Sequence, residues 1–371
     1  MAHGRSTAAS IFRWSPRVRA AALTALAFAL LLGSAISAAR GTSNSRQSVH
    51  DRSYVRGVAL GLFATDPGWD YGPLIEEIRS RGATDVLVVV NAYQSDRFAS
   101  DIAPLPGRSP SEATVARTLA QVRRAGMRAA LMPVVRLQRR GPHDWRGVIT
   151  PADGLEAWFE SYRRFVLPLA RLAQNAGAQR FVVGSELGSL EPYQDRWRAL
   201  ISELRDDFSG ALSYSANWDH ADTVQFWDAL DEVGLTAYFP LTKGGEPSSA
   251  ESLARAWRTP RAEIDDLRRR IGKPVLITEI GYPSQGSAAD QPWDDTSSEQ
   301  LDLRLQQRLY RSFCDAFSQT PSISGFYVWN WFGSGGPRDL SFTPRGKPAA
   351  NELAKCFERA WPTPATAENP S

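Results

Sequence analysis

The amino-acid sequence predicts an α/β fold, a single (β/α)8 barrel, from three observations. Eight apolar, strand-like runs follow one another between residues 57 and 361. Amphipathic helical runs lie between most of them, and no long structureless insert interrupts the order. The chain has 371 residues, and α/β barrels commonly run past about 200 residues as one domain. A doubly wound sheet is the alternative, but no glycine-rich phosphate loop follows the first strand-like run.

The predicted strands share an apolar, β-rich composition and end at polar, glycine or aromatic residues. They are Gly57–Phe63, Asp85–Tyr93, Arg128–Val135, Arg180–Leu187, Ala211–Trp218, Glu232–Pro240, Pro274–Tyr282 and Ser324–Phe332. The clearest predicted helices are Ser111–Ala125, Leu155–Asn175, Tyr193–Asp207, Ala250–Ile271, Ser298–Phe317 and Pro348–Trp361. Between the fifth and sixth strands, Thr223–Asp231 is short and only weakly helical.

Residues 1–39 have the pattern of an export segment. Four arginines and no acidic residue lie in this stretch, and the uncharged run Ala20–Ala39 follows the last arginine. Small residues at Ser37 and Ala39 fit a signal-peptidase site, which makes residues 1–39 a signal peptide. About 20 apolar residues can also span a bilayer, so an uncleaved signal anchor is the alternative. Either way the body is expected to be exported: secreted, periplasmic, or anchored in the membrane and facing outside.

The remaining chain divides into a polar linker (residues 40–56), the barrel (residues 57–361) and a short tail (residues 362–371) that is expected to be disordered. Leaving out the four N-terminal arginines, 39 basic residues stand against 40 acidic ones, a net charge of −1. A nearly neutral body gives no reason to expect a nucleic-acid partner. We expect a monomer that meets a membrane only through an uncleaved N-terminal segment.

One stretch, Lys273–Tyr282, places a single carboxylate at the end of a buried strand. Its sequence KPVLITEIGY is apolar up to Glu279 and continues with glycine and Tyr282. In barrels of alternating strands and helices, catalytic groups lie at this C-terminal tip of a strand. The fourth strand repeats the design, because Gly184 and Ser185 precede Glu186. The alternative for Glu279 is a structural ion pair with an arginine.

The other strand ends carry aromatic, amide and charged residues. They are Phe63, Asn91, Tyr93, Arg136, Asn217, Trp218, Tyr238, Trp329, Asn330 and Trp331. Aromatic faces stack on the C–H surface of a sugar ring, and amides and carboxylates bind its hydroxyl groups. The alternative for any one of these aromatic residues is packing in the barrel wall.

Two glutamates at opposite strand ends are suited to glycoside hydrolysis. That reaction needs one carboxylic acid to protonate the leaving oxygen and one carboxylate at the anomeric carbon. Strands four and seven are three apart on a ring of eight, so Glu186 and Glu279 are expected to face each other across the mouth. A retaining enzyme would hold the two carboxyl groups about 5–5.5 Å apart.

Three motifs together resemble the clan A retaining glycoside hydrolases. They are GSEL at the fourth strand, ITEIGY at the seventh and YVWNWF at the eighth. The chain is most similar to the glycoside hydrolase family 113 type, whose known members are largely β-mannanases. SANW (Ser215–Trp218) and AYFPL (Ala237–Leu241) also resemble this family, and the likeness extends from Gly57 to about Trp361.

The resemblance implies a role for each matching residue. Glu186 would be the general acid/base and Glu279 the nucleophile, with Tyr238 holding the carboxylate of Glu279. The substrate-binding residues that the resemblance implies are Asn217, Trp218, Tyr238 and Trp329, and we add Asn91, Tyr282 and Trp331 from their positions at strand ends. Glu186 would have to hold its proton near neutral pH, either because it is the more desolvated carboxyl or because it lies near the negative charge of Glu279. Glu279 would stay ionised. The third strand ends in Arg136, where relatives often carry histidine, so sugar contacts on that side are expected to differ.

The expected activity is double displacement on a β-linked polysaccharide or oligosaccharide, most similar to β-mannan. Two alternatives stay open: a carbohydrate-binding pseudoenzyme with the same barrel, and an envelope scaffold. The four histidines lack metal-ligand spacing, so no metal or other cofactor is expected. Cys314 and Cys356 lie on the last two predicted helices and are either a disulfide, which export would permit, or two buried thiols.

Overall fold

The computed structural model describes residues 53–244, 246 and 248–362. The predicted export segment therefore lies outside the described residues, as do most of the linker and all but the first residue of the tail. The first strand begins at Val55, two residues before its predicted start and within the 40–56 segment. No helix in the described part of the chain combines the length and apolar character needed to cross a bilayer.

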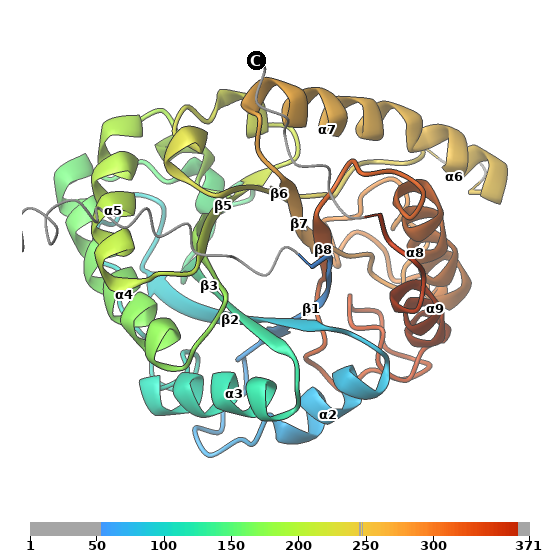
Figure 1. Ribbon diagram of the computed structural model, residues 1–371, viewed down its shortest axis with the longest axis horizontal. Helices are drawn as coiled ribbons and strands as arrows, with labels where there is room; N and C mark the ends of the chain where they lie inside the picture. Colours follow the sequence, from blue (N-terminus) through green and yellow to red (C-terminus); the bar gives the residue numbers. More distant parts are fainter. Residues whose placement is uncertain (1–52, 245, 247, 363–371) are drawn as a thin grey trace, which may run out of the picture. The chain divides into compact units, whose positions relative to one another are not determined.

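Eight parallel strands close into one barrel, which confirms the predicted fold class (Figure 1). Each strand pairs with the next along the chain, and β1 pairs with β8 to close the ring. The strands are β1 (Val55–Gly61), β2 (Asp85–Gln94), β3 (Arg128–Leu137), β4 (Arg180–Ser185), β5 (Ala211–Asn217), β6 (Glu232–Thr236), β7 (Val275–Ile280) and β8 (Gly325–Val328). Several strands are shorter at their C-terminal ends than predicted, so the residues beyond them lie in loops at the barrel mouth.

Helices surround the strand ring (Figure 1). They are α2 (Gly72–Ser80), α3 (Glu112–Arg124), α4 (Leu155–Asn175), α5 (Gln194–Asp207), α6 (Ala250–Ala256), α7 (Arg258–Ile271), α8 (Leu303–Phe317) and α9 (Pro348–Phe357), with short 3-10 turns in several loops. The predicted helix Ala250–Ile271 is two helices that meet at Trp257. Pro260 explains the break, because a proline lacks the N–H that a continuous helix needs and is tolerated only in a first turn.

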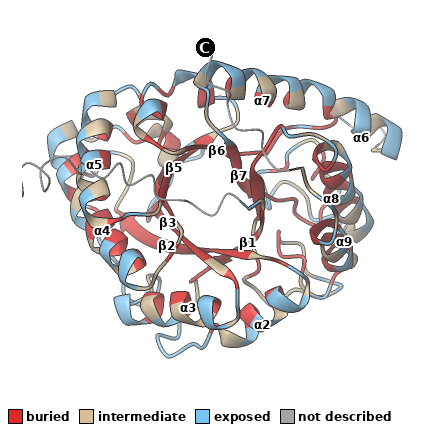
Figure 2. Cartoon of the chain, in the orientation of Figure 1, coloured by how far each residue is buried: buried red, intermediate tan, exposed pale blue. Residues whose placement is uncertain are grey.

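Side-chain alternation along the strands creates two apolar layers. On β2, Leu87 and Val89 point into the barrel, whereas Val86, Val88 and Val90 pack against the helices. Figure 2 shows this as buried residues along the strands and on the strand-facing sides of the helices. Because the side-chain period of a strand is two, the inward register of each strand leads directly to the mouth.

The base of the barrel is closed by paired charges. Asp85 accepts two hydrogen bonds from Arg128, at 2.8 and 2.6 Å, and Arg180 donates to Glu232 at 3.1 Å. Asp85, Arg180 and Glu232 are all buried at the starts of their strands. Buried charges need such partners, since an unpaired one would carry a large desolvation cost. These groups are therefore structural, and the chemistry has to be sought at the opposite end.

Cys314 on α8 and Cys356 on α9 form a disulfide, which decides between the two alternatives left by the sequence. Their Cα atoms are 5.9 Å apart and 42 residues separate them along the chain. The two helices lie side by side on the outside of the barrel (Figure 1). The bond therefore ties the last helix to the preceding one.

Replacing both cysteines with alanine should lower the free energy of unfolding by about 3–4 kcal/mol, because the cross-link restricts the unfolded chain. Urea unfolding followed by tryptophan fluorescence would measure the change. The wild-type chain in the presence of a reductant is the matched control and should lose a similar amount. Two free thiols in the non-reduced, alkylated protein would contradict the bond itself.

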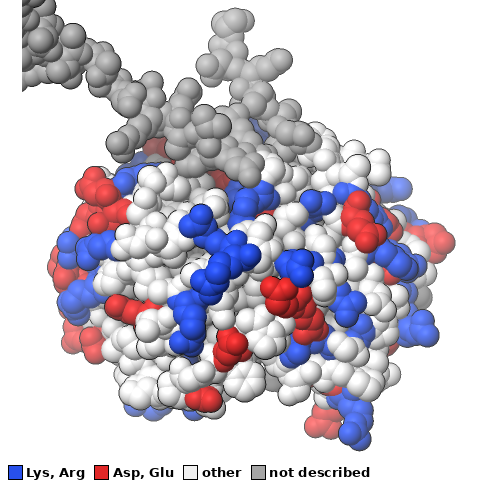
Figure 3. All heavy atoms as spheres, turned by 60° about the horizontal axis from the view of Figure 1, so that its bottom comes forward, with Lys and Arg blue, Asp and Glu red and all other residues white. Residues whose placement is uncertain are grey.

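The surface mixes charges of both signs. Figure 3 shows lysine and arginine side chains interspersed with aspartate and glutamate over one face. This agrees with a sequence that is nearly neutral once the N-terminal arginines are set aside.

Candidate active site

Glu279 lies near the tip of β7 with its side chain held by two hydroxyl groups. Tyr238 donates a hydrogen bond from Oη to Glu279 Oε2 at 3.0 Å, and Ser185 donates from Oγ to Oε1 at 3.5 Å. The β6–β7 register shifts between Leu235 and Thr236, which brings Thr236 opposite Glu279. Only 3% of Glu279 is exposed. Hydroxyl donors on both oxygens fix the orientation of this carboxyl group.

Glu186 follows β4 directly and has an unusual backbone. Its φ angle is +53°, in the left-handed region, and its backbone N–H donates to Ser215 O at 2.8 Å. A non-glycine residue in this region costs on the order of 1–3 kcal/mol, and such strain often accompanies a functional side chain. The 8% exposure of Glu186 shows that its side chain is also largely enclosed.

Arg146 binds Glu186 and was not predicted from the sequence. It opens the short helix η1 (Arg146–Val148) in the β3–α4 loop, donating from Nη2 to Glu186 Oε2 at 2.5 Å and from Nε to Ser185 O at 3.1 Å. An arginine ion pair was the predicted alternative for Glu279, whereas the structure forms this pair at Glu186. For Glu279, the described residues include no such pair. No local pattern marks Arg146, because its partner lies 40 residues away along the chain.

The two glutamates influence each other electrostatically. Burial, with a smaller contribution from the negative charge of Glu186, raises the pKa of Glu279 to about 8. Arg146, the hydrogen bond from Tyr238 and the charge of Arg136 oppose this rise. In this state Glu279 therefore keeps its proton near neutral pH. The expectation that Glu279 stays ionised is wrong for this state, and so is the first alternative for Glu186, greater desolvation, because Glu279 is the more deeply buried of the two. The second alternative, that Glu186 lies near the charge of its partner, remains a prediction.

Three other predicted residues lie on the inward register or next to it. Asn91 on β2 is buried, and its Oδ1 has no hydrogen-bond partner in the described structure. Asn217 ends β5, and its Oδ1 accepts from Trp218 N at 3.0 Å and from Thr236 Oγ1 at 3.2 Å. Trp329 is half-buried against the interior layer, and its peptide bond to Asn330 is cis.

Tyr282 and Trp331 lie in the outer apolar layer, between the strands and the helices. Their exposed fractions are 1% and 0%, and the ring of Tyr282 packs edge-on against Tyr310 at 5.2 Å. A side chain enclosed in this layer cannot contact a sugar at the mouth, so the prediction that these two residues bind substrate is wrong for this conformation. Side chains alternate between the two faces of β8 only up to Val328, where the strand ends. Trp331 lies beyond this point and packs in the outer layer, although Trp329, two residues earlier, packs against the interior layer.

Trp218 also packs outward. Its ring lies 5.1 Å from that of Phe239 and lines a cavity of about 770 Å³ beside α7. The cavity lies outside the strand ring and is lined by neither glutamate. The prediction for Trp218 is therefore not supported by the direction of its ring, whereas Asn217 stays at the strand tip.

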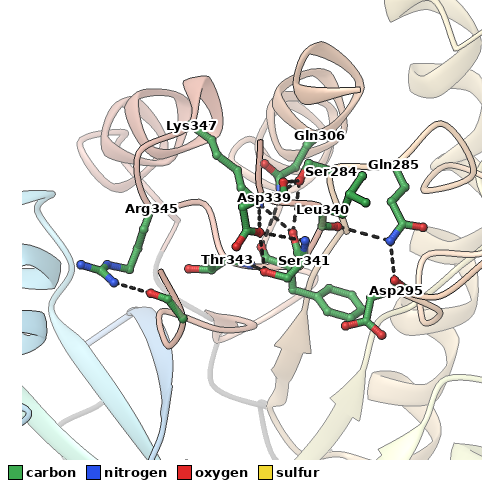
Figure 4. A network of polar contacts seen from close by, with 12 residues as sticks. Ser284, Gln285, Asp295, Gln306, Asp339, Leu340, Ser341, Thr343, Arg345 and Lys347 are labelled. Atoms are coloured by element: carbon green, nitrogen blue, oxygen red, sulfur yellow. Dashed lines mark hydrogen bonds and ion pairs between the residues drawn. The ribbon is translucent and has the colours of Figure 1, made fainter. Parts of the chain in front are cut away.

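A buried lysine connects the loops that follow β7 and β8 (Figure 4). Lys347 Nζ donates to Ser284 Oγ at 2.7 Å, Asp339 Oδ1 at 2.9 Å and Ser341 O at 2.8 Å. Its side chain is fully enclosed, and burial lowers its pKa while Asp339 opposes this change. All three donor sites of the ammonium group have acceptors, so the lysine can stay charged. These bonds fix the loops beside Glu279 and Trp329.

Replacing Lys347 with methionine should lower the free energy of unfolding by about 3 kcal/mol, because Asp339 would lose its partner in a partly buried place. Thermal unfolding would measure the effect. Lys355→Met on the exposed side of α9 is the matched control and should change little. Equal melting temperatures for the two variants would show that the Lys347 network contributes no stability.

The model of Glycoside Hydrolase Family 113 matches residues 73–339. Among solved structures, the chain is similar to a GH113 β-1,4-mannanase with 21% identity and a TM-score of 0.75, covering 82% of this chain and 99% of that one. It is also similar to the GH113 β-mannanase AaManA from Alicyclobacillus acidocaldarius in complex with ManMIm. That match has 26% identity and a TM-score of 0.74, covering 83% and 98% of the two chains. A search of curated proteins found no significant match.

Proposed function

The chain belongs to glycoside hydrolase family 113 and is a β-mannanase-like glycoside hydrolase, and we propose that it cleaves β-1,4-linked mannan-type chains with retention of anomeric configuration. The observation that carries this proposal is the pair of buried carboxyl groups at the tips of β4 and β7. Tyr238 donates a hydrogen bond to Glu279, and burial together with the negative charge of Glu186 raises the pKa of Glu279. The two glutamates therefore interact across the mouth. Paired carboxyl groups of this kind are what double displacement requires.

In the proposed first step, the Glu279 carboxylate attacks the anomeric carbon while Glu186 donates a proton to the leaving glycosidic oxygen. The bond to the leaving group breaks as a glycosyl ester of Glu279 forms. In the second step Glu186, now a carboxylate, removes a proton from water, and the water displaces Glu279. We keep the carboxyl separation of about 5–5.5 Å as a prediction.

The resting state needs a proton shift before this chemistry can start. Glu279 holds a proton near neutral pH, and Glu186 is bound by Arg146. Substrate binding would have to release Glu186 from Arg146 so that it can act as the acid, and Glu279 would have to lose its proton. Arg146 would then face the ionised Glu279. Burial lowers the pKa of Arg146, but the negative charges of Glu186 and of an ionised Glu279 outweigh burial, so its guanidinium stays charged. Arg146 is thus a positioning residue whose positive charge can compensate the negative charge of either Glu186 or Glu279.

The mannan assignment is supported by relatives. Two structures that the chain covers almost completely are described as a β-1,4-mannanase and as a β-mannanase in complex with ManMIm. Trp329 on the inner register would supply the apolar platform beneath the reacting sugar. Asn91 and Asn217 at the ends of β2 and β5 would bind its hydroxyl groups.

We also propose that the body is exported. The arginine-rich start and the apolar run Ala20–Ala39 support this, and so does the disulfide, because such bonds persist in oxidising compartments. Cell fractionation of the full chain would test it. A cytoplasmic protein with reduced cysteines would contradict the proposal.

The retention of configuration is tested by proton NMR of the first product formed from β-1,4-mannan oligosaccharides. We expect the β-anomer to form first and the α-anomer to follow only through mutarotation. An α-anomer at the earliest time points would show an inverting enzyme. Binding of mannan without any turnover would instead support the carbohydrate-binding pseudoenzyme.

A further inference from the structure

Arg136 is a cation at the barrel mouth without a bonded partner. It is the penultimate residue of β3, on the same inward register as Val134 of the interior layer. The part of the chain that the structure describes offers its guanidinium no hydrogen bond and no carboxylate within 4.0 Å. Arg146 and Arg139, in the loop that follows, bind Glu186 and Asp96. The donors of Arg136 are therefore free for a ligand.

An aromatic wall supports this guanidinium. Its Cζ lies 5.1 Å from the centre of the Phe63 ring, and Phe63 lies 6.3 Å from the ring of Trp329. Tyr93 is the register partner of Arg136 on β2. A guanidinium packed over a ring keeps the N–H groups on its edge available. Arg136 thus sits beside the aromatic surface on which a sugar face would stack.

Positive charges gather around Arg136. Partial burial lowers its pKa, the charge of Arg146 lowers it further and Arg140 adds a smaller effect, while Tyr93 and Glu279 oppose this change. Across the mouth, burial raises the pKa of Asp295, and Arg136 opposes that rise without forming an ion pair. Arg146 has Glu186 as its bonded partner, whereas no carboxylate among the described residues bonds Arg136, so a ligand anion beside Arg136 would be favoured.

A buried acceptor lies next to this cation. Asn91 on β2 pairs in register with Val134, two residues before Arg136 on the inward side of the barrel. Its Oδ1 is buried and has no donor among the described residues. Buried polar atoms are usually satisfied, so an orphaned acceptor at this position points to a bound donor such as a sugar hydroxyl. The β2–β3 side of the mouth therefore offers one free cation and one free acceptor.

We propose that Arg136 binds the carboxylate of a uronic acid unit, so that the enzyme acts on acidic β-linked oligosaccharides in preference to neutral ones. This inference rests on the proposed glycosidase function and names its substrate class. A guanidinium presents two parallel N–H donors that match a carboxylate, whereas a lone hydroxyl group uses only one of them. The aromatic wall would hold the sugar ring while Asn91 accepts a hydrogen bond from one of its hydroxyl groups.

Two tetrasaccharides that differ only at C6 test the proposal: β-1,4-linked mannose and β-1,4-linked mannuronate. The wild-type enzyme should have the higher kcat/KM on the mannuronate tetramer. Arg136→Gln should lower that value about 10- to 100-fold, the effect of losing a charge-assisted bond, and change the neutral value less than about 3-fold. Arg136→Lys should retain part of the preference. Arg124→Gln, which removes an exposed arginine at the C-terminal end of α3, is the matched control and should leave both values near wild type.

Equal losses on both tetramers would show that Arg136 contacts hydroxyl groups, and they would overturn the inference. A wild-type preference for the neutral tetramer would overturn it as well. If neither tetramer is hydrolysed, the proposed function fails, and calorimetric titration of both tetramers separates the two questions. Tighter binding of mannuronate by wild type than by Arg136→Gln would then still support the acidic subsite, whereas equal binding would reject it.

Discussion

Replacing Glu279 with glutamine should abolish turnover on every substrate and at the same time stabilise the fold. The amide cannot attack the anomeric carbon, so kcat should fall by at least about 10⁴-fold, as expected for loss of a nucleophile. The stability gain has a separate cause, because burial and the charge of Glu186 disfavour ionisation of Glu279. Hydrolysis of β-1,4-mannan oligosaccharides and thermal unfolding measure the two effects.

The pH dependence of this gain has a definite sign. The pKa of Glu279 rises from 4.5 to about 8 on folding, so between these values the folded chain keeps a proton that the unfolded chain has released. Stability conferred by the protonated group is fully present below about pH 4.5 and is lost as the pH rises towards about 8. The amount by which the free energy of unfolding of Glu279→Gln exceeds that of wild type should therefore grow as the pH rises from 4.5 towards about 8.

An exposed glutamate provides the matched control. Glu299→Gln removes the same charge from the surface of the β7–α8 loop and should alter neither turnover nor the pH dependence of unfolding. An active Glu279→Gln variant would refute the assignment of the nucleophile. If the difference in melting temperature between Glu279→Gln and wild type stays constant from about pH 5 to about pH 8, the raised pKa of Glu279 is refuted.

The fold could be predicted from the sequence because its signals are local. Each strand is an apolar run and each helix an amphipathic one, so the alternation can be read without knowledge of distant contacts. The carboxylates were predicted for the same reason, since Glu186 and Glu279 each end such a run. The break between α6 and α7 at Trp257 was missed, although Pro260 was a local signal for it.

The errors at the site have a different origin. Tyr282 and Trp331 were predicted to bind substrate because they lie at the ends of the predicted strands seven and eight, but these strands end at Ile280 and Val328 and both side chains pack in the outer apolar layer. Arg146 could not be found, because nothing in the β3–α4 loop marks its contact with the tip of β4. The raised pKa of Glu279 depends on burial and on the nearby charges of Glu186 and Arg146. Sequence patterns therefore locate the reacting groups, whereas the pKa of Glu279 and the ion pair of Glu186 depend on contacts between residues far apart in the sequence.

Replacing Glu186 with alanine should impair the two chemical steps unequally. Loss of a general acid typically costs about 10²–10⁴-fold, so hydrolysis of mannan oligosaccharides should fall by that factor. A substrate with a good leaving group, such as a dinitrophenyl β-mannoside, needs no proton in the first step. Its glycosylation should survive, and the glycosyl ester on Glu279 should accumulate because no general base activates water. Azide needs no general base, so adding it should restore turnover and yield the β-glycosyl azide.

The same variant should also shift the pH dependence of that first step. The negative charge of Glu186 helps to raise the pKa of Glu279, and without it Arg146 loses its bonded partner and can face Glu279 alone. Both changes favour the ionised nucleophile, so the rate of glycosylation should rise at lower pH than in wild type. Pre-steady-state release of dinitrophenol measures this rate. An α-glycosyl azide product, or slow glycosylation of the activated substrate at every pH, would show that Glu186 is not the acid/base of a retaining enzyme.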